Sequence, residues 1–176
     1  QVAVVLQKNV LFSGTILENL RWGNKEASKE ECIRACQLAC ADEFIEKMPE
    51  GYETYIEQGG SNVSGGQKQR AAVARALITN PELVLADEPS GALDSHAADG
   101  LMKLFGEINE EGQTIVMVTH SVKAACSAKR VLFIKDGEVF HQLYRGSLGR
   151  DEMYQKISDT LTALTTGGEK LSLIHI

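Results

Sequence analysis

Two short segments of the sequence carry residue types that could clamp and hydrolyse a nucleotide phosphate. The first is Ser64, Gly65, Gly66 and Gln67, where a loop passes into an expected helix. Glycines let the backbone approach a ligand closely, and the free N–H groups at a helix start attract anions. Ser64 adds a hydroxyl donor. A plain loop-to-helix cap is the alternative, and these four residues alone do not exclude it.

The second segment is an apolar strand expected over residues 83–86, followed by two adjacent carboxylates, Asp87 and Glu88. In α/β sheets, ligands gather at the carboxyl ends of strands. The alternative is an exposed acidic turn before Pro89. The apolar strand in front of the pair argues against that alternative, because it predicts that the pair is held at the edge of a buried sheet.

The elements that must position these residues alternate between strands and helices. Apolar runs without alternation predict strands buried on both faces at residues 2–6, 83–86 and 114–119. Asp136-Gly137 predicts a hairpin between residues 131–135 and 138–144. The pattern indicates an α/β fold with a parallel core sheet, into which an all-helical insert is set at about residues 15–80.

Helix boundaries follow from capping residues and apolar spacing. Ser28 and Glu31 fit a capping box. Ser64 opens a helix that ends near Pro81, and Ser95 is a plausible N-cap for the next one. An apolar stripe at helical spacing predicts an amphipathic helix over residues 151–165; it is formed by Met153, Ile157, Leu161 and Leu164. Further helices are expected at residues 15–22, 29–39, 42–48 and 121–128.

Composition limits the function classes. The chain has 176 residues, 43% hydrophobic content and a net charge of -6, which is typical of an ordinary globular protein and argues against a nucleic-acid partner. Its apolar runs are too short to span a membrane. Cys32, Cys36 and Cys40 are four residues apart, so the outer two would lie roughly 12 Å apart on a helix, too far for one metal ion. We expect them to be small buried side chains.

Beyond the glycine pair, residues 62–70 (Asn-Val-Ser-Gly-Gly-Gln-Lys-Gln-Arg) resemble the signature motif of ABC transporter ATPase domains. Other motifs of that family are matched in order. Gln7 resembles the Q-loop glutamine, and residues 83–88 resemble Walker B with its following glutamate. Residues 90–94 resemble the D-loop, and Thr119-His120 resembles the switch histidine. The resemblance covers residues 1–170 and implies a partial P-loop NTPase, an ABC ATPase domain with a parallel core sheet and an inserted α-helical subdomain.

The resemblance implies a role for each matched residue, with ATP and Mg²⁺ as cofactors. Glu88 would be the general base toward the attacking water, and His120 would contact the γ-phosphate. Asp87 would contact Mg²⁺, usually through water. The implied sets are Glu88, His120 and Gln7 for catalysis; Ser64, Gly65, Gly66, Gln67 and Asp94 for nucleotide binding and the dimer interface; and Asp87 and Gln7 for the metal.

The resemblance also implies partners. In this family the signature motif closes over ATP held by the opposite subunit, so a second ABC ATPase domain is expected, in a homo- or heterodimer. A transmembrane transporter domain is the other expected partner, which would place the chain at the cytoplasmic face of the cell membrane, powering export. The alternatives are a soluble ABC ATPase acting on ribosomes or DNA, whose usual basic linkers or coiled-coil arms this sequence lacks, and a catalytically incomplete fragment.

One family motif has no match here. No G-x-x-x-x-G-K-[ST] occurs in the 176 residues. We expect this phosphate-binding Walker A loop to precede Gln1. Without it, the isolated chain should neither bind ATP tightly nor turn it over. It should also fold poorly, because one strand of the core sheet would be absent.

The chain shows two further departures. Residues 1–70 resemble exporters whose ATPase is fused to the membrane domain, whereas the rest resembles stand-alone ATPases of antimicrobial-peptide resistance and lipoprotein-type transporters. A chimeric assembly and an unusual natural protein are the two interpretations. Residues 171–176 match one reading frame of a transposon-end adapter used in DNA sequencing libraries, so we expect a non-native tail without a packing partner; a natural tail is the alternative.

Overall fold

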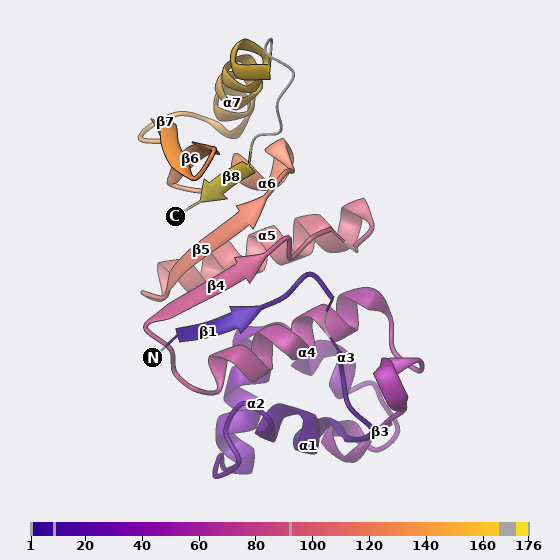
Figure 1. Cartoon of the computed structure of the whole chain (residues 1–176). Coiled ribbons are helices and arrows are strands. Elements are labelled where there is room, and N and C mark those ends of the chain that lie inside the picture. Colours follow the sequence, from indigo (N-terminus) through magenta and orange to yellow (C-terminus); the bar gives the residue numbers. More distant parts are fainter. Residues whose placement is uncertain (1, 9, 92, 166–171, 176) are drawn as a thin grey trace.

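The computed structural model describes residues 2–8, 10–91, 93–165 and 172–175. Its centre is a six-stranded sheet with the order β1-β4-β5-β8-β6-β7 (Figure 1). Strands β1, β4 and β5 run parallel to one another, and the remaining neighbouring pairs are antiparallel. The strands are β1 (Val2–Val5), β4 (Leu83–Asp87), β5 (Thr114–Thr119), β6 (Arg130–Lys135), β7 (Glu138–Tyr144) and β8 (Ser172–His175).

The register of the parallel strands aligns their carboxyl ends. Val5 of β1 pairs with Ala86 of β4, and Ala86 in turn pairs with Met117 of β5. The residues that follow each strand therefore leave the sheet at the same edge. Parallel neighbours need long crossover connections, and these are supplied by the helices between β1 and β4 and by the helix between β4 and β5.

The helices lie in the predicted regions. They are α1 (Ile16–Arg21), α2 (Lys29–Leu38), α3 (Asp42–Ile45), α4 (Gly65–Leu77), α5 (Ser95–Glu110), α6 (Val122–Ala125) and α7 (Arg150–Thr165), with 3-10 turns at Gly51–Glu53 and Gln58–Gly60. None of these described helices combines the length and apolarity needed to cross a bilayer. We expected the insert between β1 and β4 to be all-helical, and this prediction is wrong. Strands β2 (Gly14–Thr15) and β3 (Tyr55–Ile56) pair within it as a small antiparallel sheet.

Local capping chemistry starts most of these helices. Ser28 forms the predicted capping box with Glu31, and Ser64 forms one with Gln67. The prediction for α5 is wrong by one residue. Asp94, not Ser95, is its N-cap, because Asp94 has extended backbone angles and its carboxylate accepts the Ala97 N–H at 2.9 Å.

Only one face of the parallel strands is covered, which corrects the expectation of burial on both faces. Ala3 and Val5 are buried, whereas Val2 and Val4 are more than half exposed. In β4, Val84 is buried and Leu83 is only partly so. The helices lie against the face of Ala3 and Val84, and no described element covers the other face, so its apolar side chains meet solvent.

The end of the chain does have a packing partner, contrary to expectation. Strand β8 lies between β5 and β6 and pairs antiparallel with both (Figure 1). A short apolar segment satisfies the backbone groups that β5 and β6 would otherwise leave unpaired at that place. Leu171 and Ile176 lie outside the described residues. Strand β8 thus closes the sheet between β5 and β6.

A small hydrophobic cluster, separate from the main core, attaches α7 to the sheet. Val131 and Phe133 of β6 pack with Met153 and Ile157 of α7, and all four are fully buried. Leu161 packs against the same cluster, which confirms the predicted apolar stripe as far as Leu161. The side chain of Leu164 lies outside the described part of the chain. Helix α7 is therefore part of the folded body.

This packing predicts the cost of truncating a buried α7 side chain. We expect Ile157→Ala to lower the free energy of unfolding by about 2–5 kcal/mol, because it removes buried methyl groups and leaves a cavity. Tyr154→Ala, on the half-exposed side of the same helix, should cost less than about 0.5 kcal/mol. Urea unfolding of the chain followed by circular dichroism measures both. Equal losses for the two variants would show that α7 is not docked as described.

Candidate functional site

Glu88 directly follows β4 and is held from two sides by residues at the end of β5. The Thr119 hydroxyl donates a hydrogen bond to Glu88 Oε2 at 3.0 Å, and the backbone N–H of His120 donates to Oε1 at 2.7 Å. The His120 ring also lies close, with its Nε2 3.7 Å from Oε1. The Glu88 side chain is 20% exposed, and that of His120 is 65% exposed. The carboxylate is thus fixed in orientation while the imidazole faces solvent.

The Glu88 backbone is strained. Its φ of 42° lies in the left-handed region, which a residue with a side chain adopts at a cost of roughly 1–3 kcal/mol. The Glu88 N–H donates to the Val118 carbonyl at 2.9 Å, and the Glu88 carbonyl accepts the Gly91 N–H at 2.9 Å. These hydrogen bonds hold a tight turn over residues 88–91, which turns the Glu88 side chain toward Thr119.

Gln7 reaches the same edge of the sheet from β1. Its side chain lies against Gly91: a Cβ atom built on Gly91 would be 2.7 Å from Gln7 Nε2 and 3.3 Å from the Glu88 carbonyl oxygen. The Gln7 amide and the Glu88 carbonyl are thus both close to Gly91. The carboxyl ends of three parallel strands bring together Gln7, Glu88 and His120, which are far apart in sequence.

Asp87 is the last residue of β4 and is exposed at the same edge, opposite Val118. An exposed carboxylate at this edge fits Mg²⁺, which prefers oxygen ligands, keeps several waters and usually binds one or two protein carboxylates together with substrate phosphates. Asp87 and Gln7 would hold such an ion, and the ion would neutralise phosphate charge there. No cluster of three or more His, Cys, Asp or Glu side chains suited to a metal occurs within the described ranges.

The glycine pair lies in a different place. Ser64 is the N-cap of α4, and its Oγ accepts the Gln67 N–H at 3.3 Å while Gln67 Oε1 accepts the Ser64 N–H at 2.8 Å. A cleft of about 490 Å³ lies between α4 and α5, and Ser64, Gly65, Gly66 and Asp94 are among its lining residues. Gln7, Glu88 and His120 are not among them. The predicted site residues thus form two groups within one chain.

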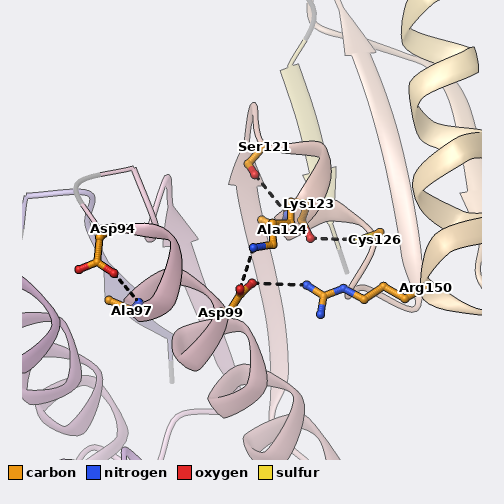
Figure 2. A network of polar contacts seen from close by, with 8 residues as sticks. All are labelled: Asp94, Ala97, Asp99, Ser121, Lys123, Ala124, Cys126 and Arg150. Atoms are coloured by element: carbon orange, nitrogen blue, oxygen red, sulfur yellow. Dashed lines mark hydrogen bonds and ion pairs between the residues drawn. The ribbon is translucent and has the colours of Figure 1, made fainter.

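A polar network joins α5 to the helix that follows His120. Asp99 of α5 accepts a hydrogen bond from Lys123 Nζ of α6 at 2.7 Å, and Arg150 Nη2 lies 3.7 Å from the same carboxylate (Figure 2). The hydrogen bond from Lys123 is the main reason that the pKa of Asp99 is below its usual value. Ser121 caps α6 by accepting the Ala124 N–H. The helix capped by Asp94 is thereby tied to the helix that begins beside His120.

Thr119 is the one site residue to which sequence reasoning gave no role of its own. Its side chain is fully buried, and its oxygen also accepts the Ser121 N–H at 3.1 Å. A hydroxyl at the end of a strand that neighbours an acidic strand end could have indicated it. The pairing of β4 with β5, which places Thr119 beside Glu88, is a long-range contact that sequence patterns do not specify.

The ABC transporter family model matches residues 1–91 of this chain. The uncharacterized ABC transporter ATP-binding protein YfiB of Bacillus subtilis (strain 168) is 38% identical over 161 residues, which are 91% of this chain and 28% of that protein. The alpha-hemolysin translocation ATP-binding protein HlyB of Escherichia coli is 37% identical over 142 residues, 81% of this chain and 20% of that protein.

Among solved structures, one of a bacterial Atm1-family ABC exporter with ATP bound matches with a TM-score of 0.73 and 30% identity, over 91% of this chain and 28% of that one. The chain belongs to the ABC transporter family, and it is homologous to the ATP-binding part of exporters. It spans less than a third of the length of these relatives. The expected α/β ABC ATPase fold is confirmed.

The buried hydroxyl of Thr119 gives a test of the Glu88 contacts. Thr119→Val keeps the side-chain shape but removes one donor to Glu88 and one acceptor for Ser121. We expect it to lower the free energy of unfolding by about 1–3 kcal/mol, because buried polar partners lose hydrogen bonds. Thr114→Val, at the exposed start of the same strand, should have little effect. Urea denaturation measures both, and an unchanged stability for Thr119→Val would argue against these contacts.

Proposed function

We propose that this chain is the part of an ABC exporter ATPase that supplies the catalytic carboxylate to its own nucleotide and the signature motif to its neighbour's. On this proposal residues 1–170 belong to one ABC ATPase domain, with a helical subdomain at about residues 15–80, and residues 171–176 are a non-native tail. The observation that carries the proposal is the meeting of Gln7, Glu88 and His120 at one sheet edge.

Each residue at that edge has a role in hydrolysis. Glu88 accepts a proton from the attacking water, and the donors from Thr119 and His120 keep its carboxylate oriented. His120 Nε2, on the exposed side, donates to the γ-phosphate. Asp87 and Gln7 hold Mg²⁺, which supplies charge neutralisation for the transferring phosphoryl group. Positioning and charge account for the catalysis, because phosphoryl transfer needs little covalent help.

The separate cleft with Ser64 and Asp94 supports a second subunit. The N–H groups of Gly65 and Gly66 lie in the first turn of α4 and suit a phosphate, whereas those of Ser64 and Gln67 are used in the capping box. They do not share a cleft with Glu88, which fits a nucleotide brought by a partner domain. Two such domains, in a homo- or heterodimer, would enclose two ATP molecules, and Asp94 would lie at their interface.

The Walker A motif, absent from these 176 residues, must be supplied for activity. That motif supplies a lysine and a loop around the β- and γ-phosphates. The isolated chain is on this view catalytically incomplete, although the transporter that contains it is active. The net charge of -6 gives no support to a nucleic-acid partner.

An exposed aromatic pair supports a membrane partner. Phe12 and Trp22 are 41% and 62% exposed, and their ring centroids are 4.6 Å apart. Arg75 contacts Phe12 and the backbone beside it: its guanidinium lies 5.8 Å from the Phe12 ring and donates to the Val10 carbonyl. Exposed aromatics next to the loop of Gln7 suit docking of a transmembrane domain. On this proposal, that partner would hold the chain at the cytoplasmic face of the cell membrane.

The proposed chemistry predicts the effect of Glu88→Gln in the complete transporter. We expect ATP hydrolysis to fall about 10²–10⁴-fold, because the amide cannot accept the proton, while nucleotide binding is retained. Glu138→Gln, in the exposed hairpin, is the matched control. Phosphate release and fluorescent-nucleotide binding measure the two properties. The 176-residue chain alone should show no turnover; full hydrolysis by Glu88→Gln, or by the isolated chain, contradicts the proposal.

The docking role predicts that Trp22→Ala uncouples ATP hydrolysis from transport in the complete transporter. Removal of the exposed indole leaves the nucleotide site intact, so basal hydrolysis should stay within about twofold while transport falls roughly tenfold or more, as expected for an aromatic anchor at an interface. Vesicle transport assayed beside ATPase activity measures both. Tyr154→Ala, also a half-exposed aromatic, serves as control. Unchanged transport in Trp22→Ala would move the docking surface elsewhere.

A further inference from the structure

Gly91 lies between two loops that come from distant parts of the sequence. Its N–H closes the turn after β4 by donating to the Glu88 carbonyl at 2.9 Å. Its Cα side is covered by the amide end of Gln7, which follows β1. A Cβ on Gly91 would be 2.7 Å from Gln7 Nε2, 3.4 Å from Gln7 Cδ and 3.3 Å from the Glu88 oxygen. Real Cβ atoms essentially never approach another atom as closely as 2.7 Å.

The reason for glycine here is space, not backbone conformation. The φ of Gly91 lies outside the left-handed region, so a residue with a side chain could adopt it. The hairpin glycine is the opposite case: Gly137 has a φ of 82° and nothing within 4 Å of its Cβ position. At Gly91 the missing methyl group is what leaves room for the Gln7 amide.

From this contact we propose that Gly91 is a positioning residue: it forms the seat that holds the Gln7 amide beside the turn of Glu88. The inference rests on the proposed function, in which Gln7 and Glu88 act on the same nucleotide. Gly91 touches no substrate and acts only through Gln7. The identity of residue 91 therefore determines where the Gln7 amide stands relative to the catalytic carboxylate.

A methyl group on Gly91 would clash with a flexible side chain and come close to a backbone atom. The closest atom is the far end of a flexible Gln7 side chain, whereas the Glu88 carbonyl oxygen, at 3.3 Å, needs only a small adjustment. Gln7 is exposed, so its side chain has room to adopt another rotamer when a methyl group occupies its place. Gly91→Ala should therefore displace the Gln7 amide without unfolding the chain. Its effect on the site should equal that of removing the Gln7 side chain, although Gln7 itself is unchanged.

The contact is tested first without any activity. In the 176-residue chain labelled with ¹⁵N-glutamine, the Gln7 side-chain amide resonance is assigned by its loss in Gln7→Ala. Gly91→Ala should shift that resonance. Gly106→Ala, at a helical glycine with nothing within 4 Å of its Cβ position, should not. An unshifted Gln7 resonance in Gly91→Ala overturns the seat, whatever the chain's activity.

A double-mutant cycle in the complete transporter tests the consequence. We expect Gly91→Ala to lower kcat for ATP roughly 10- to 100-fold, the scale of a misplaced positioning group, with KM within about twofold. Gly106→Ala should match the parent. In a Gln7→Ala background, Gly91→Ala should cause no further loss.

The two proposals fail in different ways. An equal loss from Gly91→Ala in both backgrounds would mean that the methyl group acts through the Glu88 turn, and it would overturn the inference about Gln7. A transporter whose hydrolysis is indifferent to both Gln7→Ala and Glu88→Gln would contradict the proposed function instead, and the amide resonance would still decide whether Gly91 seats Gln7.

Discussion

The parallel pairing of β1, β4 and β5 is the constraint on which the candidate site depends. Gln7, Glu88 and His120 are neighbours only because three strand ends stop at one edge of the sheet, in the register that pairs Val5 with Ala86 and Ala86 with Met117. Side chains alternate between the faces of a strand, so a shift of one residue would send them to the opposite face. The hydrogen bond from the Glu88 N–H to the Val118 carbonyl continues the pairing of β4 and β5 one residue beyond the strand.

Strain at Glu88 is balanced by these surroundings. A left-handed backbone in a residue with a side chain persists only where other contacts determine it, and here there are several: the backbone bonds to Val118 and Gly91, and the side-chain bonds from Thr119 and His120. A carboxylate held in this way needs no rearrangement when charge develops near it, which is the physical content of electrostatic preorganisation. The two bonds to the carboxylate keep it turned toward the strand ends.

Sequence reasoning succeeded where structure is determined locally. The capping box of Ser28, the helix opened by Ser64, the strand Thr114–Thr119 and the hairpin at Asp136-Gly137 depend on residues a few positions apart, and all four are present. It failed where distant segments decide. An apolar run has the same appearance whether one or both faces are covered, so the exposure of Val2 and Val4 was not predictable. The pairing of Thr119 with Glu88, and of β8 with β5 and β6, joins residues far apart in the chain, and no local pattern specifies such contacts.

Helix α5 connects the two groups of site residues. Its N-cap, Asp94, lies on the cleft shared with Ser64, and one turn later Asp99 bonds Lys123 of α6, whose first turn follows His120. Exposed ion pairs add little to stability, so the value of this contact lies in geometry: it joins the cleft-lining end of α5 to α6, which begins two residues after His120. At the end of β5, just before α6, the His120 N–H holds the Glu88 carboxylate. The two groups of site residues are therefore separate in space and are linked through α5 and its contact with α6.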